Sequence, residues 1–140
     1  MIHLTSAIYP DATIDGVDID EKMIGIGKKY FGLDRVAGLT LVVEDAKAFL
    51  ARAVRKQKHW DMILVDTHVG PDVPEFVNNE RFLTLVRHAT APRGMVMINY
   101  LRELKYQALS EDLRIKLKKI FRNVCETDIY FNRFFCCRYA

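Results

Sequence analysis

The sequence predicts an α/β fold, a three-layer sandwich built on a mainly parallel sheet that ends in an antiparallel C-terminal hairpin. Three observations lead to this prediction. Short apolar, β-branched segments alternate with segments of helical periodicity. Two of the apolar segments are continuous enough for strands covered on both faces. The last two strand-like segments are too close together for a helix to connect them, so they should pair antiparallel.

The first half of the chain contains two strand–helix pairs. Residues 13–19 predict a short strand, and Asp20 stands where it can cap the helix that follows. The apolar face of this helix is predicted at Met23, Ile26, Gly27, Tyr30 and Phe31. Residues 39–43 form an apolar, β-branched segment typical of a strand. The next helical repeat comprises Ala46, Phe49, Leu50, Ala53 and Val54.

The alternation continues through the middle of the second half. Residues 60–65 form a continuous apolar run that predicts a buried strand, and a loop around Gly70, Pro71 and Pro74 follows it. The next helix presents Phe82, Leu85, Val86 and Ala89 on one face. Residues 92–94 predict a turn and residues 95–98 a buried strand.

The end of the chain contains the longest helix and the hairpin. The apolar positions of the helix are Tyr106, Leu109, Leu113, Leu117 and Ile120. Residues 121–129 and 133–139 predict two strands joined around Asn132. With 140 residues and no linker or repeat, the sequence favours one domain over residues 1–140.

Composition excludes several classes of protein. Apolar residues make up 50% of the chain and charged residues 28%, which is typical of a globular protein rather than a disordered one. The net charge of +3 is too small to indicate a nucleic-acid partner, and no apolar run reaches the about 18 residues of a membrane helix. The three cysteines, Cys125, Cys136 and Cys137, are interpreted as reduced core thiols of a cytoplasmic protein. The scattered histidines predict no metal site.

Carboxylates follow the predicted strands at three places, and ligands of open α/β sheets bind at the carboxyl ends of strands. Asp18 has no capping role, so its two oxygens suit the two hydroxyls of a ribose. Asp45 suits the amino group of an adenine, with the Ala46 N–H facing a ring nitrogen, but an N-cap is the favoured interpretation of Asp45 alone. Asp66 ends the central strand and no helix begins after it, so a cap does not explain it. Tyr100, at the end of the last predicted parallel strand, is a candidate for lining the path of a substrate, but an exposed loop residue is the favoured interpretation.

Four segments resemble successive motifs of the class I S-adenosylmethionine-dependent methyltransferases, and most closely the spermidine-synthase-like branch. That branch includes the aminopropyltransferases and the methyltransferase-like proteins that modify elongation factor 1-alpha. The four segments are residues 17–20, 43–46, 61–66 and 92–96, and residues 31–33 and 78–83 fit the same branch. The resemblance implies a Rossmann-like fold with S-adenosylmethionine as cofactor. It places Asp18 at the ribose, Asp45 and Ala46 at the adenine, and Asp66 at the reacting centre, and it counts Ile19 among the residues that bind the cofactor.

The chain departs from the family pattern at its start. Residues 1–12 contain no glycine and resemble the end of the helix that normally follows the first strand and its glycine-rich loop. The sequence therefore looks like an N-terminally truncated domain, and the missing loop argues against cofactor binding. In the family sheet the missing strand lies between the strands that end at Asp18 and Asp66. Those two strands would either keep unpaired edges or pair directly.

A second departure concerns the acids of the aminopropyltransferases. These enzymes carry two acids around a short Ser/Thr stretch, whereas this chain has Val69 at the position of the second acid, in the stretch that begins at Asp66. Asp72 could replace that acid only if the loop bends differently. An apolar side chain neither attracts a cationic polyamine nor takes its proton.

Three functions follow from these patterns. The first is methyl transfer from S-adenosylmethionine to a protein amine, with Asp66 orienting the amine. The second is aminopropyl transfer of the spermidine synthase type, to a small amine. The third is a non-catalytic interaction module, in which unpaired strand edges favour a homodimer. None of the three implies a nucleic-acid or membrane partner.

Overall fold

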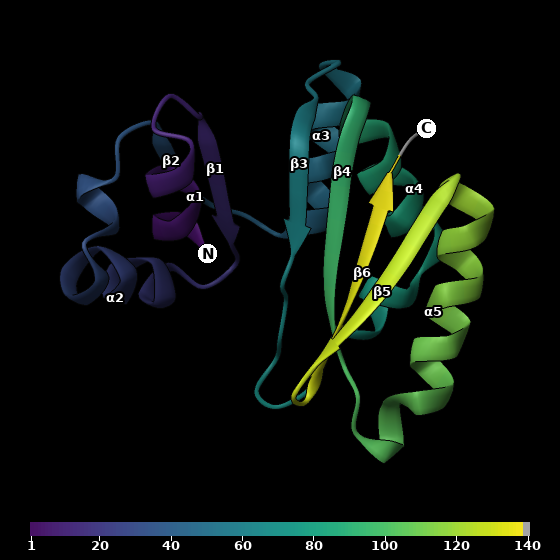
Figure 1. The fold of residues 1–140 in the computed structure, drawn as a ribbon. Coiled ribbons are helices and arrows are strands. Elements are labelled where there is room, and N and C mark those ends of the chain that lie inside the picture. The colour runs from purple at the N-terminus through teal and green to yellow at the C-terminus, as the bar shows by residue number, and fades with distance from the viewer. Residues whose placement is uncertain (139–140) are drawn as a thin grey trace. The chain divides into compact units, whose positions relative to one another are not determined.

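The computed structural model describes residues 1–138 (Figure 1). The chain divides into two compact units, Met1–Phe49 and Leu50–Ala140, and each is described by itself. The interpretation of residues 1–140 as one domain stays a prediction. The predicted end of the last strand at residue 139 lies outside the described residues.

The first unit is a two-stranded parallel sheet with helices. Its elements are α1 (Ile2–Ile8), β1 (Ile14–Asp18), α2 (Glu21–Phe31), the 3₁₀ turn η1 (Leu33–Arg35) and β2 (Leu39–Val43). The helix α3 (Ala46–Arg55) begins in this unit. β1 and β2 pair in parallel, from Ile14 opposite Leu39 to Asp18 opposite Val43. All the strands and helices predicted here are confirmed.

The helix α2 is capped as predicted but buries a different face. The Lys22 N–H donates to Oδ1 of Asp20 at 2.8 Å, and Gly32 ends the helix at φ 63°. Ile24 and Gly27 are buried, and a Cβ on Gly27 would lie 2.6 Å from Cδ1 of Leu33. The absence of a side chain at Gly27 therefore lets Leu33 of η1 pack against the helix. The predicted apolar positions Met23, Ile26, Tyr30 and Phe31 are exposed, so that part of the face prediction is wrong.

The second unit is a four-stranded sheet in the order β3-β4-β6-β5. Its elements are β3 (Trp60–Val65), η2 (Glu75–Asn78), α4 (Glu80–Ala89), β4 (Thr90–Leu101), η3 (Leu104–Tyr106), α5 (Gln107–Ile120), β5 (Asn123–Ile129) and β6 (Asn132–Arg138). β3 and β4 pair in parallel, and the other two pairs are antiparallel. The predicted α/β class and C-terminal hairpin are confirmed. Within the described residues β1 pairs with β2 in one sheet, and β3 pairs with β4 in the other. Which of the two expected arrangements the strands ending at Asp18 and Asp66 adopt stays a prediction.

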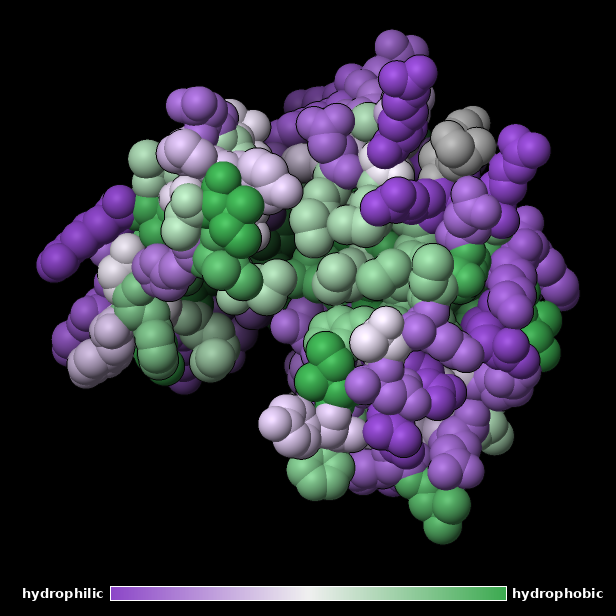
Figure 2. Space-filling view, in the orientation of Figure 1, coloured by the Kyte–Doolittle hydropathy of each residue, from purple (hydrophilic) through white to green (hydrophobic). Residues whose placement is uncertain are grey.

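The core of the second unit lies between its sheet and the helices α4 and α5; Figure 1 shows α4 behind the sheet and α5 alongside β5. The fully buried residues include Leu83, Val86, Leu113, Leu117, Val96, Ile98 and Phe135. Strand alternation puts Met95 and Met97 on the opposite face, beside Met62 and Leu64 of β3. Figure 2 shows apolar side chains gathered on this face, which we call the open face.

The predicted turn at Pro92–Gly94 is a bulge inside a longer strand. Trp60 pairs with Thr90 but Met62 pairs with Met95, so β4 holds three extra residues at this point. Arg93 adopts φ 68° within the bulge. A Cβ on Gly94 would lie 2.8 Å from the Ala91 carbonyl oxygen, so only glycine fits there without a shift.

Candidate functional site

Asp18 ends β1 and shapes the turn that leads into α2. Its Oδ1 accepts a 2.8 Å hydrogen bond from the Asp20 N–H, so the side chain has a local backbone contact that the sequence analysis did not predict. No other hydrogen bond to the Asp18 carboxylate is made within residues 1–138. Ile19, next in the chain, is 70% exposed. The second oxygen of the Asp18 carboxylate is therefore available to accept a hydrogen bond, and the next residue, Ile19, has an exposed apolar side chain.

Asp45 follows β2 and caps α3. Its Oδ1 accepts hydrogen bonds from the N–H groups of Lys47 at 2.9 Å and Ala48 at 3.1 Å. Burial favours the neutral carboxyl, but the bonds from Ala48 and Lys47 and the Lys47 charge outweigh it and lower the pKa of Asp45. The capping interpretation is confirmed, and contact with an adenine stays a prediction.

The register of β1 and β2 brings the two acids to one edge of the first unit. Asp18 lies opposite Val43, and the Glu44 N–H donates to the Asp18 carbonyl oxygen at 3.0 Å. Asp45 and Ala46 follow directly along the chain. The carboxyl ends of two adjacent parallel strands thus carry all four residues predicted to bind the cofactor.

Asp66 follows β3 in the second unit and is held by its neighbours there. Nδ2 of Asn99 on β4 donates to its Oδ1 at 2.8 Å, and Nε2 of His68 lies 3.5 Å from the same oxygen. The side chain remains 46% exposed. Sequence reasoning missed Asn99 and gave His68 no role, although an asparagine near the end of an apolar strand is a usable signal.

Two further oxygens without a partner belong to residues that adjoin Asp66, namely its hydrogen-bond partner Asn99 and the next residue in the chain, Thr67. Oδ1 of Asn99 and Oγ1 of Thr67 are buried and accept or donate no hydrogen bond among the described residues. Buried polar atoms in proteins are nearly always paired, so two unpaired oxygens on residues that adjoin Asp66 call for an explanation. Carboxylate, amide and hydroxyl oxygens together can accept from an N–H donor.

Asp72, in the loop that follows Asp66, is held by two residues of η3. Nζ of Lys105 donates to its Oδ1 at 2.7 Å, and the Tyr106 hydroxyl donates to the same oxygen. These two bonds, the one from Lys105 first, lower the pKa of Asp72. Val69 also exchanges backbone hydrogen bonds with Asp72. Asp72 is the candidate replacement for the acid absent at Val69, and these contacts already occupy its side chain and backbone.

Tyr100 lies in the core of the second unit rather than in a loop, so its predicted exposure is wrong. Its side chain is buried on β4, and its ring packs edge-to-face on Tyr106 with centroids 6.0 Å apart. Burial, then the proximity of Tyr106 and Asp112, raises the pKa of Tyr100. The sequence placed the end of the strand at Ile98, whereas it continues to Leu101.

Metal-binding clusters and membrane-spanning helices are both absent from the described residues. No group of three or more His, Cys, Asp or Glu side chains within residues 1–138 is arranged to hold a metal ion. Over the same residues, no helix combines the length and the apolar character needed to cross a membrane.

The chain is similar to two kinds of transferase in sequence. A probable polyamine aminopropyl transferase of Bifidobacterium longum is 32% identical over 91 residues, which cover 65% of this chain and 19% of that protein. An eEF1A lysine and N-terminal methyltransferase homolog of Drosophila pseudoobscura pseudoobscura is 26% identical over 126 residues, covering 85% of this chain and 18% of that protein. The chain thus spans about a fifth of the length of these curated relatives.

Solved structures share the fold. Human methyltransferase-like protein 13, crystallised with SAH, superposes with a TM-score of 0.88 at 20% identity over 99% of this chain and 66% of that one. A probable spermidine synthase of Corynebacterium glutamicum gives a TM-score of 0.82 at 16% identity over 99% and 52% of the two chains. At these identities the likeness shows a Rossmann-like fold.

The family itself is shown by a match that spans most of the sequence. The family described as "Spermine/spermidine synthase domain" matches residues 8–135. That range includes the segments at Asp18, Asp45 and Asp66 on which the resemblance rests. The chain belongs to the spermine/spermidine synthase domain family.

Proposed function

We propose that this chain is an S-adenosylmethionine-dependent methyltransferase domain that acts on a protein amine. The observation that carries the proposal is the common edge of Asp18 and Asp45, at the carboxyl ends of the paired strands β1 and β2. Ligands of open α/β sheets bind at such an edge. The proposal goes beyond the family assignment, which covers more than one transfer reaction.

The residues at this edge fit the nucleoside part of the cofactor. The carboxylate of Asp18 has an oxygen to spare for a ribose hydroxyl, and the exposed Ile19 offers an apolar surface to a purine ring. Oδ2 of Asp45 lies 3.5 Å from Nζ of Lys47 and makes no backbone hydrogen bond, and Ala46 supplies an N–H at the start of α3. Residues 1–12 contain no glycine, so they do not supply a glycine-rich loop for the methionine part of the cofactor. When bound, the cofactor supplies a methyl group on a sulfonium, which a neutral amine can attack.

Asp66 is proposed to orient that amine. Only an uncharged nitrogen has a lone pair for the methyl carbon, so the chain must hold the amine by its N–H groups. The Asp66 carboxylate is an exposed acceptor for such groups, and the hydrogen bond from Asn99 holds it in place. A protein acceptor is supported by the name of the Drosophila relative, a lysine and N-terminal methyltransferase homolog.

Aminopropyl transfer is the second candidate, because the Bifidobacterium relative carries that activity in its name. The loop after Asp66 disfavours it. Val69 is 71% exposed at the position where the aminopropyltransferases carry a second acid to attract a polyamine. Asp72 forms an ion pair with the positively charged Lys105. Of the two carboxylates in residues 66–72, Asp66 and Asp72, a polyamine would find only Asp66 without a lysine or arginine partner.

Calorimetry of the folded chain with S-adenosylmethionine and S-adenosylhomocysteine tests the proposal. We expect saturable binding of both, followed by methyl transfer to a lysine-containing protein substrate. Transfer from decarboxylated S-adenosylmethionine to putrescine would instead establish the second candidate. Absence of heat at millimolar ligand, with folding verified by circular dichroism, would leave a non-catalytic interaction module such as a homodimer. Cytoplasmic location stays a prediction.

A further inference from the structure

The three cysteines occupy three different environments. Cys137 is fully buried, Cys136 is half-buried and Cys125 is exposed. The interpretation of all three as core thiols is therefore correct for Cys137 and wrong for Cys125. All three are free thiols in the structure.

The register of the C-terminal hairpin sets two of them opposite each other. Cys125 on β5 pairs with Cys136 on β6. Directly opposed residues of antiparallel strands have Cα atoms about 4.5 or about 5.5 Å apart, depending on the hydrogen-bonding pattern. Both separations fall within the range of about 4.4–6.8 Å that disulfides span. The register therefore places the two Cα atoms within the span of a disulfide.

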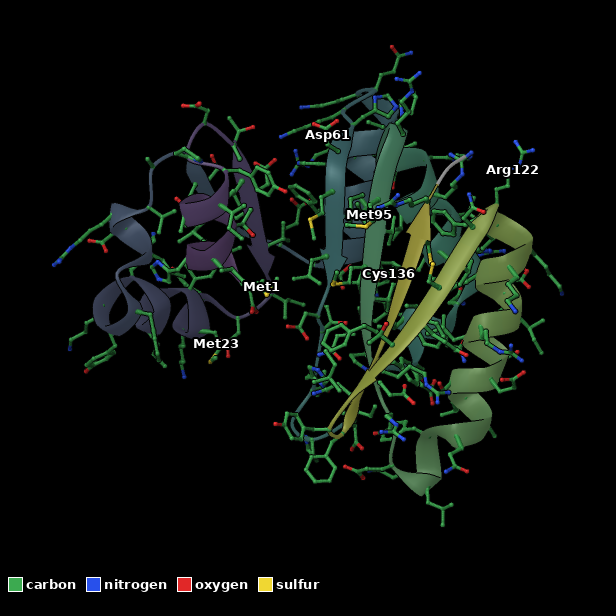
Figure 3. The ribbon with its side chains drawn as sticks, viewed as in Figure 1. Met1, Met23, Asp61, Met95, Arg122 and Cys136 are labelled. Carbon is green, nitrogen blue, oxygen red and sulfur yellow. The ribbon has the colours of Figure 1, made fainter. Side chains whose placement is uncertain are left out.

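Strand alternation puts both thiols on the open face. Cys136 pairs with Met97 across β4, and Met97 with Leu64 across β3, so one row of side chains runs across the sheet to Cys125. Figure 3 shows Cys136 and Met95 on the part of the sheet turned to the viewer. Cys137 belongs to the other face, opposite Val124, and cannot reach Cys125 from there.

The environments also separate the thiols in reactivity. Burial, then the nearby thiols of Cys136 and Cys125, raises the pKa of Cys137 to about 12, which keeps it protonated. Burial and then Cys125 raise the pKa of Cys136, against a smaller effect of Arg138. Cys125 is the thiol that a reagent in solution reaches first.

We propose that Cys125 and Cys136 are a dithiol site that forms a reversible intramolecular disulfide with a disulfide oxidant such as oxidised glutathione. The Cys125 thiolate attacks one sulfur of the oxidant, forming a mixed disulfide and releasing one reduced glutathione. The Cys136 thiolate then attacks Sγ of Cys125, which closes the protein disulfide and releases the second glutathione. Two protein thiols are oxidised and one glutathione disulfide is reduced to two thiols. The proposal is independent of the transfer reaction.

The test is to incubate the native chain with oxidised glutathione, alkylate the remaining thiols and map the peptides by mass spectrometry. We expect the number of free thiols to fall from three to one per chain, with Cys125 linked to Cys136, Cys137 alkylated after unfolding, and no glutathione retained. Dithiothreitol should restore all three thiols. Retention of three thiols, a stable glutathione adduct at Cys125, or a link to Cys137 or to a second chain would each overturn the proposal.

Two variants check which thiols form the disulfide. Cys137→Ala should still lose both of its thiols, and Cys125→Ser should form no intramolecular disulfide. Circular dichroism checks that each variant folds. Peptide mapping of the unaltered chain identifies the linked residues by itself, so the result stands even if Cys137→Ala fails to fold. A disulfide in Cys125→Ser would show that Cys136 pairs with Cys137 and would contradict the proposal.

Discussion

Nδ2 of Asn99 donates a 2.8 Å hydrogen bond to Oδ1 of Asp66, and this contact joins the carboxyl ends of the parallel strands β3 and β4. Val65 pairs with Ile98, so Asp66 and Asn99 are the next residues along a regular register. A hydrogen bond to a charged acceptor restricts the rotamer of the carboxylate. We infer that Asn99 is a positioning residue for Asp66.

Asn99→Ala should lower kcat of methyl transfer about tenfold to a hundredfold, the loss expected for one charged hydrogen bond. Calorimetry should show unchanged affinity for S-adenosylmethionine, because Asn99 is not among the residues proposed to hold the cofactor. Asn123→Ala, at an exposed position of the same sheet, is the matched control and should leave kcat unchanged. An equal loss of kcat and of cofactor affinity in Asn99→Ala would assign Asn99 a structural role.

Asp18→Ala should weaken cofactor binding at least tenfold, which corresponds to about 1.5–3 kcal/mol for hydrogen bonds to a carboxylate. Asp18→Asn should bind with intermediate affinity, because its side-chain oxygen can still accept from the Asp20 N–H and hold the turn. Asp34→Asn, a carboxylate in η1 of the same unit, serves as the control. The measurement is calorimetric titration with S-adenosylhomocysteine. Equal affinities for Asp18→Ala and the unaltered chain would exclude the ribose contact.

The order and type of the main elements could be predicted from local pattern. Residues 39–43 and 60–65 are strands with the predicted bounds, because β-branched apolar runs between turn residues leave few alternatives. The cap at Asp20 was predicted for a similar reason, since it depends on hydrogen bonds to the next few residues.

Contacts between segments far apart in the sequence could not be predicted in this way. The burial of Tyr100 depends on Tyr106 and on how far β4 extends, and the bond of Asp66 to Asn99 depends on the β3/β4 register. The prediction for the apolar face of α2 was partly wrong because periodicity identifies an apolar face but not which segment covers it. For the site, the places of Asp18 and Asp45 at strand ends and the cap at Asp45 were predicted from local sequence, whereas the hydrogen bond from the Asp20 N–H to Asp18 required the structure.

The cap at Asp45 should make stability depend on pH. The folded-state pKa of Asp45 is lowered from 3.8, so its ionised form favours the folded state at pH values above the unfolded pKa. This contribution is lost as the pH falls below 3.8 and through the lowered folded-state pKa. Asp45→Ala should therefore lower the free energy of unfolding by about 1 kcal/mol at neutral pH, the usual cost of removing a cap.

Urea denaturation of Asp45→Ala and the unaltered chain at a series of pH values checks this prediction. The difference in unfolding free energy should be constant from neutral pH to about 5 and should shrink below 3.8. Asp45→Asn keeps a side-chain acceptor for Lys47 and Ala48 and should lose less stability than Asp45→Ala. A difference that does not change with pH would mean that the charge of Asp45 adds nothing to the cap.

Two glycines should respond to alanine in opposite directions. A Cβ on Gly94 would lie 2.8 Å from the Ala91 carbonyl oxygen and 3.0 Å from that of Asp61, and both are backbone atoms that cannot turn away. Gly94→Ala should therefore destabilise the second unit by about 1–3 kcal/mol, the usual cost of overpacking. Gly25 lies inside α2, and a Cβ added to it would meet nothing within 4 Å, so Gly25→Ala should stabilise the helix by about 0.5–1 kcal/mol. Thermal denaturation followed by circular dichroism measures both, and a Gly94→Ala chain as stable as the unaltered one would show that the bulge relaxes to admit a side chain.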